Sequence, residues 1–197
     1  MTSWMVVTSA DNYQRTIDLG FVKQGFKARQ RRRVMENMKP GDNLLYYVTA
    51  VQVFAATATI TSEGFEEHEL IWLSKPGEDY PWRVEVKADR VPAEEDWIPT
   101  HMHGPALEYM QKWPAKHWKL AFQGNLHQIP DADFATIRQA LAGTKQIKIP
   151  ANPAKKAKTA KTAKTAVKKS APKKQAAPVI KTVAAKKAVK KPAAKRS

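Results

Sequence analysis

Apolar and polar residues follow the patterns of short strands and helices through the first 150 residues. The run WMVVTS (4–9) is largely β-branched and apolar, which is typical of a buried strand. Two later runs, LLYYVTA (44–50) and VQVFAATATI (51–60), favour a pair of strands. Residues 82–91, WRVEVKADRV, alternate between apolar and charged side chains. This alternation predicts a half-buried strand with Arg83 on its polar face.

Helix signals separate these strand-like runs. In DNYQRTIDLG (11–20), Asp11 or Asn12 is the expected N-cap and Gly20 the expected C-cap. Asp131 is expected to cap the last of three further helices, which we predict at residues 28–38, 104–112 and 131–143. Short strands with interspersed helices indicate an α+β fold, a small, mostly antiparallel and partly closed β-barrel surrounded by short helices.

Charge divides the chain into two parts. All 18 acidic residues and 18 of the 34 Lys and Arg residues precede residue 151, so residues 1–150 carry no net charge. The other 16 basic residues, and with them the whole net charge of +16, lie in residues 151–197. All aromatic residues lie in the first part, so only that part can bury a sizeable core. We predict a folded domain over residues 1–146 and a disordered Lys/Ala/Pro-rich tail over residues 147–197.

The predicted tail has the composition of a polyanion-binding segment. It contains AKTAKTAKTA (157–166), and it resembles the Lys/Ala/Pro tails of linker histones and of some bacterial nucleoid-associated proteins. Lysines at this density neutralise phosphates without reading the base sequence. The alternative is a tail that only increases solubility. The expected phosphate contacts are Lys155, Lys156, Lys158, Lys161, Lys164, Lys168, Lys169, Lys173 and Lys174.

The sequence excludes several chemistries and leaves one open. Without cysteine, it has no disulfide, no thiolate metal site and no cysteine nucleophile. It has no spanning-length apolar run, no signal-peptide pattern and no Walker, Rossmann or G-x-S-x-G motif. We therefore expect a non-enzymatic monomer without cofactor, metal or membrane contact, cytoplasmic and nucleoid-associated, or nuclear in a eukaryotic cell. His101 and His103 in THMHG, followed by Glu108, leave a small metal-dependent enzyme as an alternative.

Several short pieces of the first 143 residues carry a family resemblance. They are WMVVTS with Asn12 after it, the Gly25 step before a basic helix, KPGD (39–42), YYV (46–48), YPWRVEV (80–86), KWPAKHW (112–118) and FQGNLHQIP (122–130). In this order and spacing the chain resembles an EVE domain, a member of the PUA-like superfamily that also contains the YTH domains. The resemblance implies a small barrel with a pocket for a single, often modified, nucleobase.

The resemblance also implies which residues line that pocket. By their order along the chain, the base-binding residues would be Ser9, Asn12, Gln24, Gly25, Tyr47 and Trp72. Many relatives have a tryptophan at the position of Gln24, whose amide can read a base edge but cannot stack as an indole does. Independently of the resemblance, basic side chains at the start of a helix favour phosphate contact, here by Arg29, Arg31, Arg32 and Arg33.

Together these features predict a nucleic-acid-binding protein. The neutral domain would select a nucleobase in DNA or RNA, and the basic tail would supply affinity. In the alternative hypothesis, the tail condenses RNA or the nucleoid, and the domain is a structural head.

Overall fold

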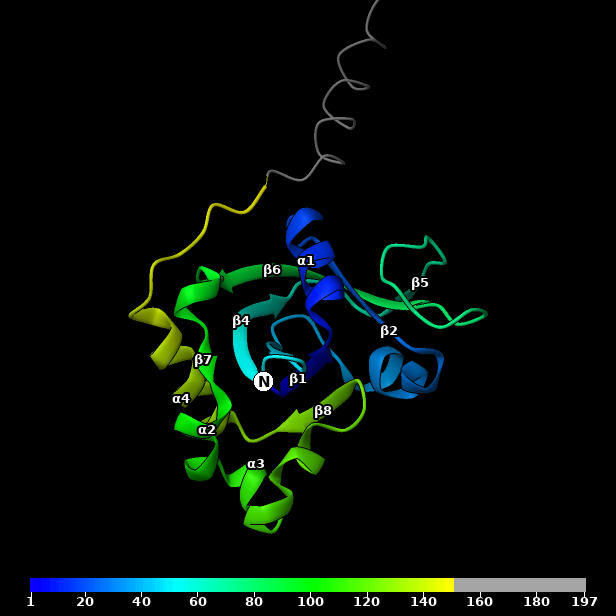
Figure 1. Cartoon of the computed structure of the whole chain (residues 1–197). Coiled ribbons are helices and arrows are strands. Elements are labelled where there is room, and N and C mark those ends of the chain that lie inside the picture. The colour runs from blue at the N-terminus through cyan, green and yellow to red at the C-terminus, as the bar shows by residue number, and fades with distance from the viewer. Residues whose placement is uncertain (151–197) are drawn as a thin grey trace, which may run out of the picture.

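The computed structural model describes residues 1–150, and its main feature is a curled eight-stranded sheet (Figure 1). The strands are β1 (Ser3–Thr8), β2 (Lys23–Phe26), β3 (Asn43–Val48), β4 (Val53–Ile60), β5 (Phe65–Glu66), β6 (Trp82–Arg90), β7 (Ile98–Pro99) and β8 (Leu126–Ile129). The α-helices are α1 (Ala10–Asp18), α2 (Thr100–His103), α3 (Glu108–Gln111) and α4 (Asp131–Ala142). Short 3-10 or π-helical segments are η1 (Ala28–Gln30), η2 (Arg33–Asn37), η3 (Glu94–Asp96), η4 (Gly104–Ala106) and η5 (Ala115–Phe122).

The strands follow the order β2-β6-β4-β3-β1-β8, with β5 added to β6 and β7 added to β4. Among the strands of residues 1–150, β1 and β3 pair in parallel and the other pairs are antiparallel. Figure 1 shows the sheet curled into a half-barrel, with short helices around it. The predicted α+β class and its mostly antiparallel, partly closed barrel are therefore confirmed, as is the pairing of the two strands predicted between residues 44 and 60.

Both faces of the central strands are buried, which explains their nearly continuous apolar sequences. Along β1, Trp4 belongs to a first core cluster that includes side chains of α1, and Met5 belongs to a second cluster that includes side chains of α4. On β3, Tyr46 and Tyr47 divide in the same way. Successive side chains of a strand point to opposite faces, so each central strand contributes to both clusters.

The N-cap of the first helix lies two or three residues before its predicted position, and the C-cap lies one residue before its predicted position. Ser9, and not Asp11 or Asn12, is the N-cap, and its Oγ accepts a hydrogen bond from the Asn12 backbone N–H at 3.3 Å. Leu19 is the C-cap. Gly20 follows it with a φ of 76°, in the left-handed region that glycine adopts without strain.

The other three predicted helices lie where the sequence placed them but differ in detail. Asp131 does not cap α4 but is its first residue, because its carboxylate accepts a hydrogen bond from Ser3 Oγ–H at 2.6 Å instead. The basic helix predicted at 28–38 is present over residues 28–37, but its type changes from 3-10 in η1 to π-helical in η2, with Arg31 and Arg32 helical between them. The Ala28 carbonyl accepts from the Arg31 N–H and also from Trp82 Nε1–H, at 3.0 Å. The helix predicted at 104–112 is interrupted at Leu107, which is extended and buried in the second core cluster.

Within residues 1–150, no helix has the length and apolar character needed to span a membrane. Ile147 and Ile149, near the end of the described chain, pack against the first core cluster. The phosphate contacts predicted from Lys155 to Lys174 lie outside the described residues.

Candidate functional site

An open polar cleft of about 320 Å³ lies where β1 leads into α1. Five segments that are distant in sequence form its walls. They are the β1–α1 turn with Ser9 and Asn12, the residues after β2 with Lys27 and Arg29, Thr49 directly after β3, the loop before β6 with Leu73, Lys75 and Tyr80, and the turn before β8 with Asn125. The curl of the sheet brings these segments to one opening.

Asn12 fixes one wall of the cleft. Its Nδ2–H donates to the Leu73 carbonyl at 2.9 Å, and its Oδ1 accepts from the Leu73 N–H at 2.7 Å. Its Nδ2 also lies 3.4 Å from the Tyr80 hydroxyl oxygen. Both ends of the amide are therefore engaged, so Asn12 positions the loop and is not a free base-reading group. Ser9, exposed at the cleft edge, caps α1 through its Oγ and keeps its hydroxyl proton as a donor.

Gly25 and Trp72 lie behind the wall that Tyr80 forms. A Cβ atom on Gly25 would lie 2.4 Å from Trp72 Cζ3 and 2.9 Å from Tyr80 Cβ. The Trp72 and Tyr80 rings are 6.0 Å apart and tilted by 58°, and Trp72 Nε1–H donates to Thr16 Oγ1 at 2.9 Å. Trp72 is only 5% exposed. The close approach that Gly25 permits is therefore taken by Trp72, which supports the cleft from behind.

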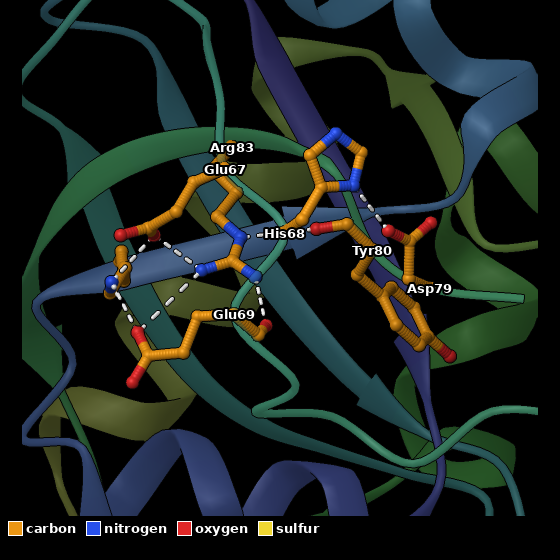
Figure 2. Close-up of polar contacts among 7 residues, drawn as sticks. Glu67, His68, Glu69, Asp79, Tyr80 and Arg83 are labelled. Carbon is orange, nitrogen blue, oxygen red and sulfur yellow. Dashed lines mark hydrogen bonds and ion pairs between the residues drawn. The ribbon is translucent and has the colours of Figure 1, made fainter.

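Arg83 is fully buried under the loop between β5 and β6, although alternation placed it on the polar face of its strand. Figure 2 shows its guanidinium surrounded by groups of this loop: Nε donates to the Tyr80 carbonyl at 3.1 Å, and the other nitrogens donate to the Glu67 carboxylate and the Glu69 carbonyl. The guanidinium carbon also lies 5.3 Å from the centroid of the Trp72 ring, within cation–π range. One buried cation thus ties both arms of the loop that forms the cleft wall.

The carboxylates around Arg83 are shared with a second cation. Lys23 Nζ on β2 lies 2.6 Å from Glu67 Oε2 and 3.1 Å from Glu69 Oε2. The hydrogen bond from Lys23, reinforced by that from Arg83, lowers the pKa of Glu67, although burial opposes this. Glu67 therefore stays ionised at neutral pH and compensates the buried guanidinium.

A histidine joins the two ends of the same loop at the surface. The His68 ring contacts the Asp79 carboxylate (Figure 2), with Nδ1 2.6 Å from Asp79 Oδ2, and His68 Nε2 lies 3.1 Å from Glu66 Oε1. The hydrogen bond with Asp79, followed by that with Glu66, raises the pKa of His68. Protonation of His68 therefore strengthens the closure of the loop.

Three cationic side chains reach the cleft, from Lys27, Arg29 and Lys75. Lys27 Nζ lies 5.8 Å from the centroid of the Tyr80 ring and 2.8 Å from Glu78 Oε2. The hydrogen bond from Lys27 is the largest cause of the lowered pKa of Glu78. The cleft is thus locally cationic, although residues 1–150 as a whole carry no net charge.

The four arginines predicted to contact phosphate have different surroundings. Arg29 lines the cleft. Arg31 lies over the indole of Trp82 at 5.2 Å, and Arg32 pairs with a carboxylate one helical turn away. Arg33 donates to a backbone carbonyl of β8 at 2.8 Å, which docks the basic segment onto the sheet. Only Arg29 of the four is brought to the cleft.

Asn125 carries a buried acceptor at the cleft. Its Nδ2–H donates to the Val7 carbonyl at 3.2 Å, whereas its Oδ1 has no hydrogen-bond partner within residues 1–150. A buried acceptor without a donor costs free energy, so a hydrogen bond from a ligand N–H to this oxygen would be favourable. His127, two residues later, is partly buried, and its pKa is lowered by this burial and by the charges of Arg33 and Arg29. It is therefore neutral at pH 7.

Two of the predicted pocket residues lie away from the cleft. Gln24 is 4% exposed, and its Nε2–H donates to the carbonyl of Gly25 at 2.8 Å; as the neighbour of Gly25 on β2, it points to the opposite face. Tyr47 belongs to the second core cluster, where its ring stacks on Phe122 at a centroid distance of 3.9 Å. Tyr46 and Tyr47 do alternate as predicted, but neither lines the cleft.

Other cleft residues were missed from the sequence. Tyr80 and Asn125 belong to two pieces that carry the family resemblance, YPWRVEV and FQGNLHQIP, so a signal for them existed. Lys27 and Lys75 are ordinary surface lysines by sequence, and only the fold shows that they meet at one opening.

The two histidines of the alternative enzyme hypothesis lie on α2, away from the cleft. Within the part of the chain that the structure describes, no group of three or more His, Asp or Glu side chains is placed to hold a metal ion. His101 instead lines a separate apolar groove.

The half-barrel is similar to solved YTH domains. The YTH domain of the Zygosaccharomyces rouxii MRB1 protein, solved in complex with N6-methyladenosine RNA, superposes with a TM-score of 0.54 at 16% identity and covers 74% of this chain and 90% of its own. The Pho92 YTH domain, solved in complex with m6A, superposes with a TM-score of 0.54 at 15% identity, covering 75% of this chain and 89% of its own. At this identity, the similarity shows a common fold.

Two proteins described as UPF0310 are similar in sequence. One, from Pyrococcus abyssi, is 25% identical over 154 residues, which are 72% of this chain and 100% of that protein. The other, from Renibacterium salmoninarum, is 28% identical over 143 residues, which are 72% of this chain and 96% of that protein. The family model of the EVE domain matches residues 2–140, nearly the whole folded part. The chain therefore belongs to the EVE domain family, as its sequence resemblance predicted.

Proposed function

We propose that this chain is a non-enzymatic nucleic-acid-binding protein. In this proposal the cleft accepts a single nucleobase, modified in its natural target, and the basic C-terminal segment binds phosphates of the same DNA or RNA without regard to sequence. The domain thus supplies selectivity, and the segment supplies affinity.

The observation that carries the proposal is the combination of groups at the cleft. Tyr80 offers an aromatic ring on which an extruded base can stack, and the Oδ1 of Asn125 can accept an N–H from the base edge. Lys27, Arg29 and Lys75 surround the same opening and can neutralise the flanking phosphates. A nucleotide presents this set of partners: a flat ring with hydrogen-bonding edges, next to negative charge.

The solved relatives support the proposal and also suggest a difference. YTH domains with this fold have been solved in complex with N6-methyladenosine RNA. In this chain Gln24 is turned away, and Tyr80 is the one aromatic residue that lines the cleft. We therefore propose that hydrogen bonding at Asn125 contributes more to base selection than enclosure between aromatic rings does.

The charge distribution supports a separate role for the C-terminal segment. Residues 151–197 carry 16 basic and no acidic residues, whereas the cleft brings three cations together. On duplex DNA each neutralised phosphate adds about −0.9 to the slope of log K against log salt, so the cleft alone accounts for a slope of about −3 at most. A steeper slope requires contacts outside the cleft, and a slope that becomes shallower when residues 151–197 are removed assigns those contacts to the segment.

The base-recognition half is tested by titrating the full chain with short single-stranded oligonucleotides that differ in one modified base. Tyr80→Leu keeps apolar bulk but removes the ring, and it should weaken binding of the preferred oligonucleotide by about 5- to 150-fold, the range for loss of one stacked base. Tyr80→Phe keeps the ring and is the matched control. If the Leu variant binds the preferred oligonucleotide as tightly as the Phe variant does, recognition in the cleft is wrong.

The tethering half is tested by comparing the full chain with residues 1–150 on one duplex over a salt series, after circular dichroism has established that the shorter chain is folded. We expect the shorter chain to bind more weakly and with a shallower salt slope. Equal affinity and slope would contradict tethering. If instead no variant of the cleft alters base preference and the segment accounts for all binding, the alternative of a condensing segment with a structural head is favoured.

A further inference from the structure

A second recess, here called the tryptophan groove, lies at α2, α3 and η5. Its volume is about 290 Å³, and its seven lining residues include Pro105, Met110, Trp113 and Trp118, with His101 and Gln111 as the polar members. In Figure 1, α2 and α3 lie at the bottom of the domain and α1 lies at the top. The groove and the cleft share no lining residue, so they are separate sites.

The groove presents rigid aromatic surface to solvent. Trp113 is 38% exposed, although large apolar side chains are mostly buried in this domain. Trp118 packs edge-to-face on Phe122, with centroids 6.0 Å apart and ring planes at 84°, and Phe122 belongs to the second core cluster. The indole of Trp118 is thus held by the core while it lines an open recess, as a stacking platform requires.

The surroundings of the groove are cationic. Three exposed lysines, Lys112, Lys116 and Lys119, lie at α3 and η5, against one exposed acidic residue, Glu108, at the start of α3. Lys119 Nζ lies 5.7 Å from the centroid of the Trp118 ring. None of the seven lining residues is acidic. Because residues 1–150 are neutral overall, this excess is a local feature that complements an anion bearing flat apolar rings.

We propose that the tryptophan groove is a second nucleic-acid contact, which stacks an unpaired base of a single strand on Trp113 and Trp118 while Lys112, Lys116 and Lys119 contact the adjacent phosphates. Unlike the cleft, the groove has no buried polar side-chain atom without a partner among its lining residues, so it offers stacking without a specific base-edge partner. Stacking of this kind tolerates any base. The inference extends the proposed function to another face of the domain and depends on different residues.

NMR of the tryptophan indole N–H groups tests whether a base binds in the groove. The full chain is labelled with ¹⁵N at tryptophan and titrated with a short unpaired oligonucleotide. We expect the signals of Trp113 and Trp118 to shift, with the buried Trp4 as an internal control and Trp72, behind the cleft wall, as the reporter of cleft binding. A shift of Trp72 alone would overturn the groove and leave the cleft proposal intact. Shifts of Trp113 and Trp118 without Trp72 would support the groove and count against the cleft.

Affinity measurements separate stacking from simple apolar docking. Trp113→Ala and Trp113→Leu in the full chain should both weaken single-strand binding by about 5- to 150-fold, whereas Trp113→Phe should retain most of it. Binding to duplex, whose bases are already stacked, should change little in all three variants. If Trp113→Leu binds the single strand as well as Trp113→Phe does, the groove docks an apolar group, and the inference is wrong. Thermal unfolding of each variant checks that the fold is kept.

The lysines have a matched control elsewhere on the domain. On a single strand each phosphate contact contributes about 0.7 to the slope of log K against log salt. Changing Lys112, Lys116 and Lys119 together to Gln should therefore make that slope shallower by about 2. The control changes three other exposed lysines to Gln: Lys87, Lys145 and Lys148. Equal effects of the two triple variants would mean that only total charge matters, and would overturn a local phosphate contact.

Discussion

Gly25→Ala is the smallest change that tests how the cleft wall is supported. The added methyl group would lie 2.4 Å from Trp72 Cζ3, 2.7 Å from Trp72 Cε3 and 2.9 Å from Tyr80 Cβ. Non-bonded carbons prefer about 3.5–4.0 Å, so Trp72 or the strand must move. Trp72 cannot move freely, because Nε1–H donates to Thr16 and the ring lies over the Arg83 guanidinium. The substitution therefore strains the wall from behind without touching a ligand.

The expected change in the free energy of unfolding is the balance of two opposing effects. Forcing an extra methyl group into a packed core costs about 1–3 kcal/mol. Replacing glycine by alanine also restricts the unfolded chain, which stabilises the fold by about 0.4–1 kcal/mol where the backbone permits it. Gly143→Ala is the matched control, because Gly143 has φ −78° and its added Cβ would meet only the Ala140 carbonyl, at 4.0 Å. The entropic effect is common to both variants, so Gly25→Ala should be less stable than Gly143→Ala by about 1–3 kcal/mol.

Urea unfolding followed by tryptophan fluorescence measures this difference, and a lower midpoint at unchanged m-value identifies a true change in stability. A double-mutant cycle assigns its cause: in a Trp72→Leu background, which lacks the indole atoms nearest to Gly25, the cost of Gly25→Ala should largely disappear. If Gly25→Ala is as stable as Gly143→Ala, or if its cost persists in the Trp72→Leu background, the proposed packing of Trp72 on Gly25 is wrong.

Three other predictions follow from the cleft wall. Glu67→Gln should lower the free energy of unfolding by about 1–3 kcal/mol, which is less than the loss of a fully buried ion pair because the Glu67 side chain is 36% exposed. The control Glu63→Gln, in the exposed pair with Lys39, should change this free energy by about 0.5 kcal/mol or less, and denaturant titration measures both variants. Asn12→Ala should accelerate amide hydrogen exchange in residues 73–78 and leave α4 unchanged, because both amide bonds to Leu73 are lost. Histidine NMR titration should give a pKa above 6.5 for His68 and below 6.5 for His127. Because its pKa is raised, His68 contributes stability that is present below pH 6.5 and lost as the pH rises through its folded-state pKa. His127, whose pKa is lowered, destabilises the fold as the pH falls below 6.5. His68→Gln should therefore make the loss of stability on acidification steeper.

The strands could be predicted from the sequence where the pattern of apolar residues shows how many faces of a strand are buried. The β-branched run at 4–9 and the paired runs at 44–60 became central strands, because continuous apolar sequence suits strands covered on both faces. Helix ends were less predictable. Ser9 and Asp11 are both good N-caps, and the choice depends on where β1 ends, which the register with β3 sets at Thr8. Likewise Asp131 was available as a cap but is engaged by Ser3, 128 residues earlier in the chain.

The cleft was less predictable, because its geometry depends on what covers each strand face. Alternation in β6 correctly divides the side chains between two faces, and Glu85 and Lys87 are exposed on the polar face as expected. Arg83 lies on that same face but is buried, because the β5–β6 loop folds over it and brings Glu67 against the guanidinium. The acidic run EGFEEHE was the available signal, since a charge is buried only where an opposite charge compensates it. A loop this rich in carboxylates, placed directly before a strand with one arginine among its first residues, favours closure over that arginine, and the closure sets the positions of Trp72 and Tyr80 at the cleft.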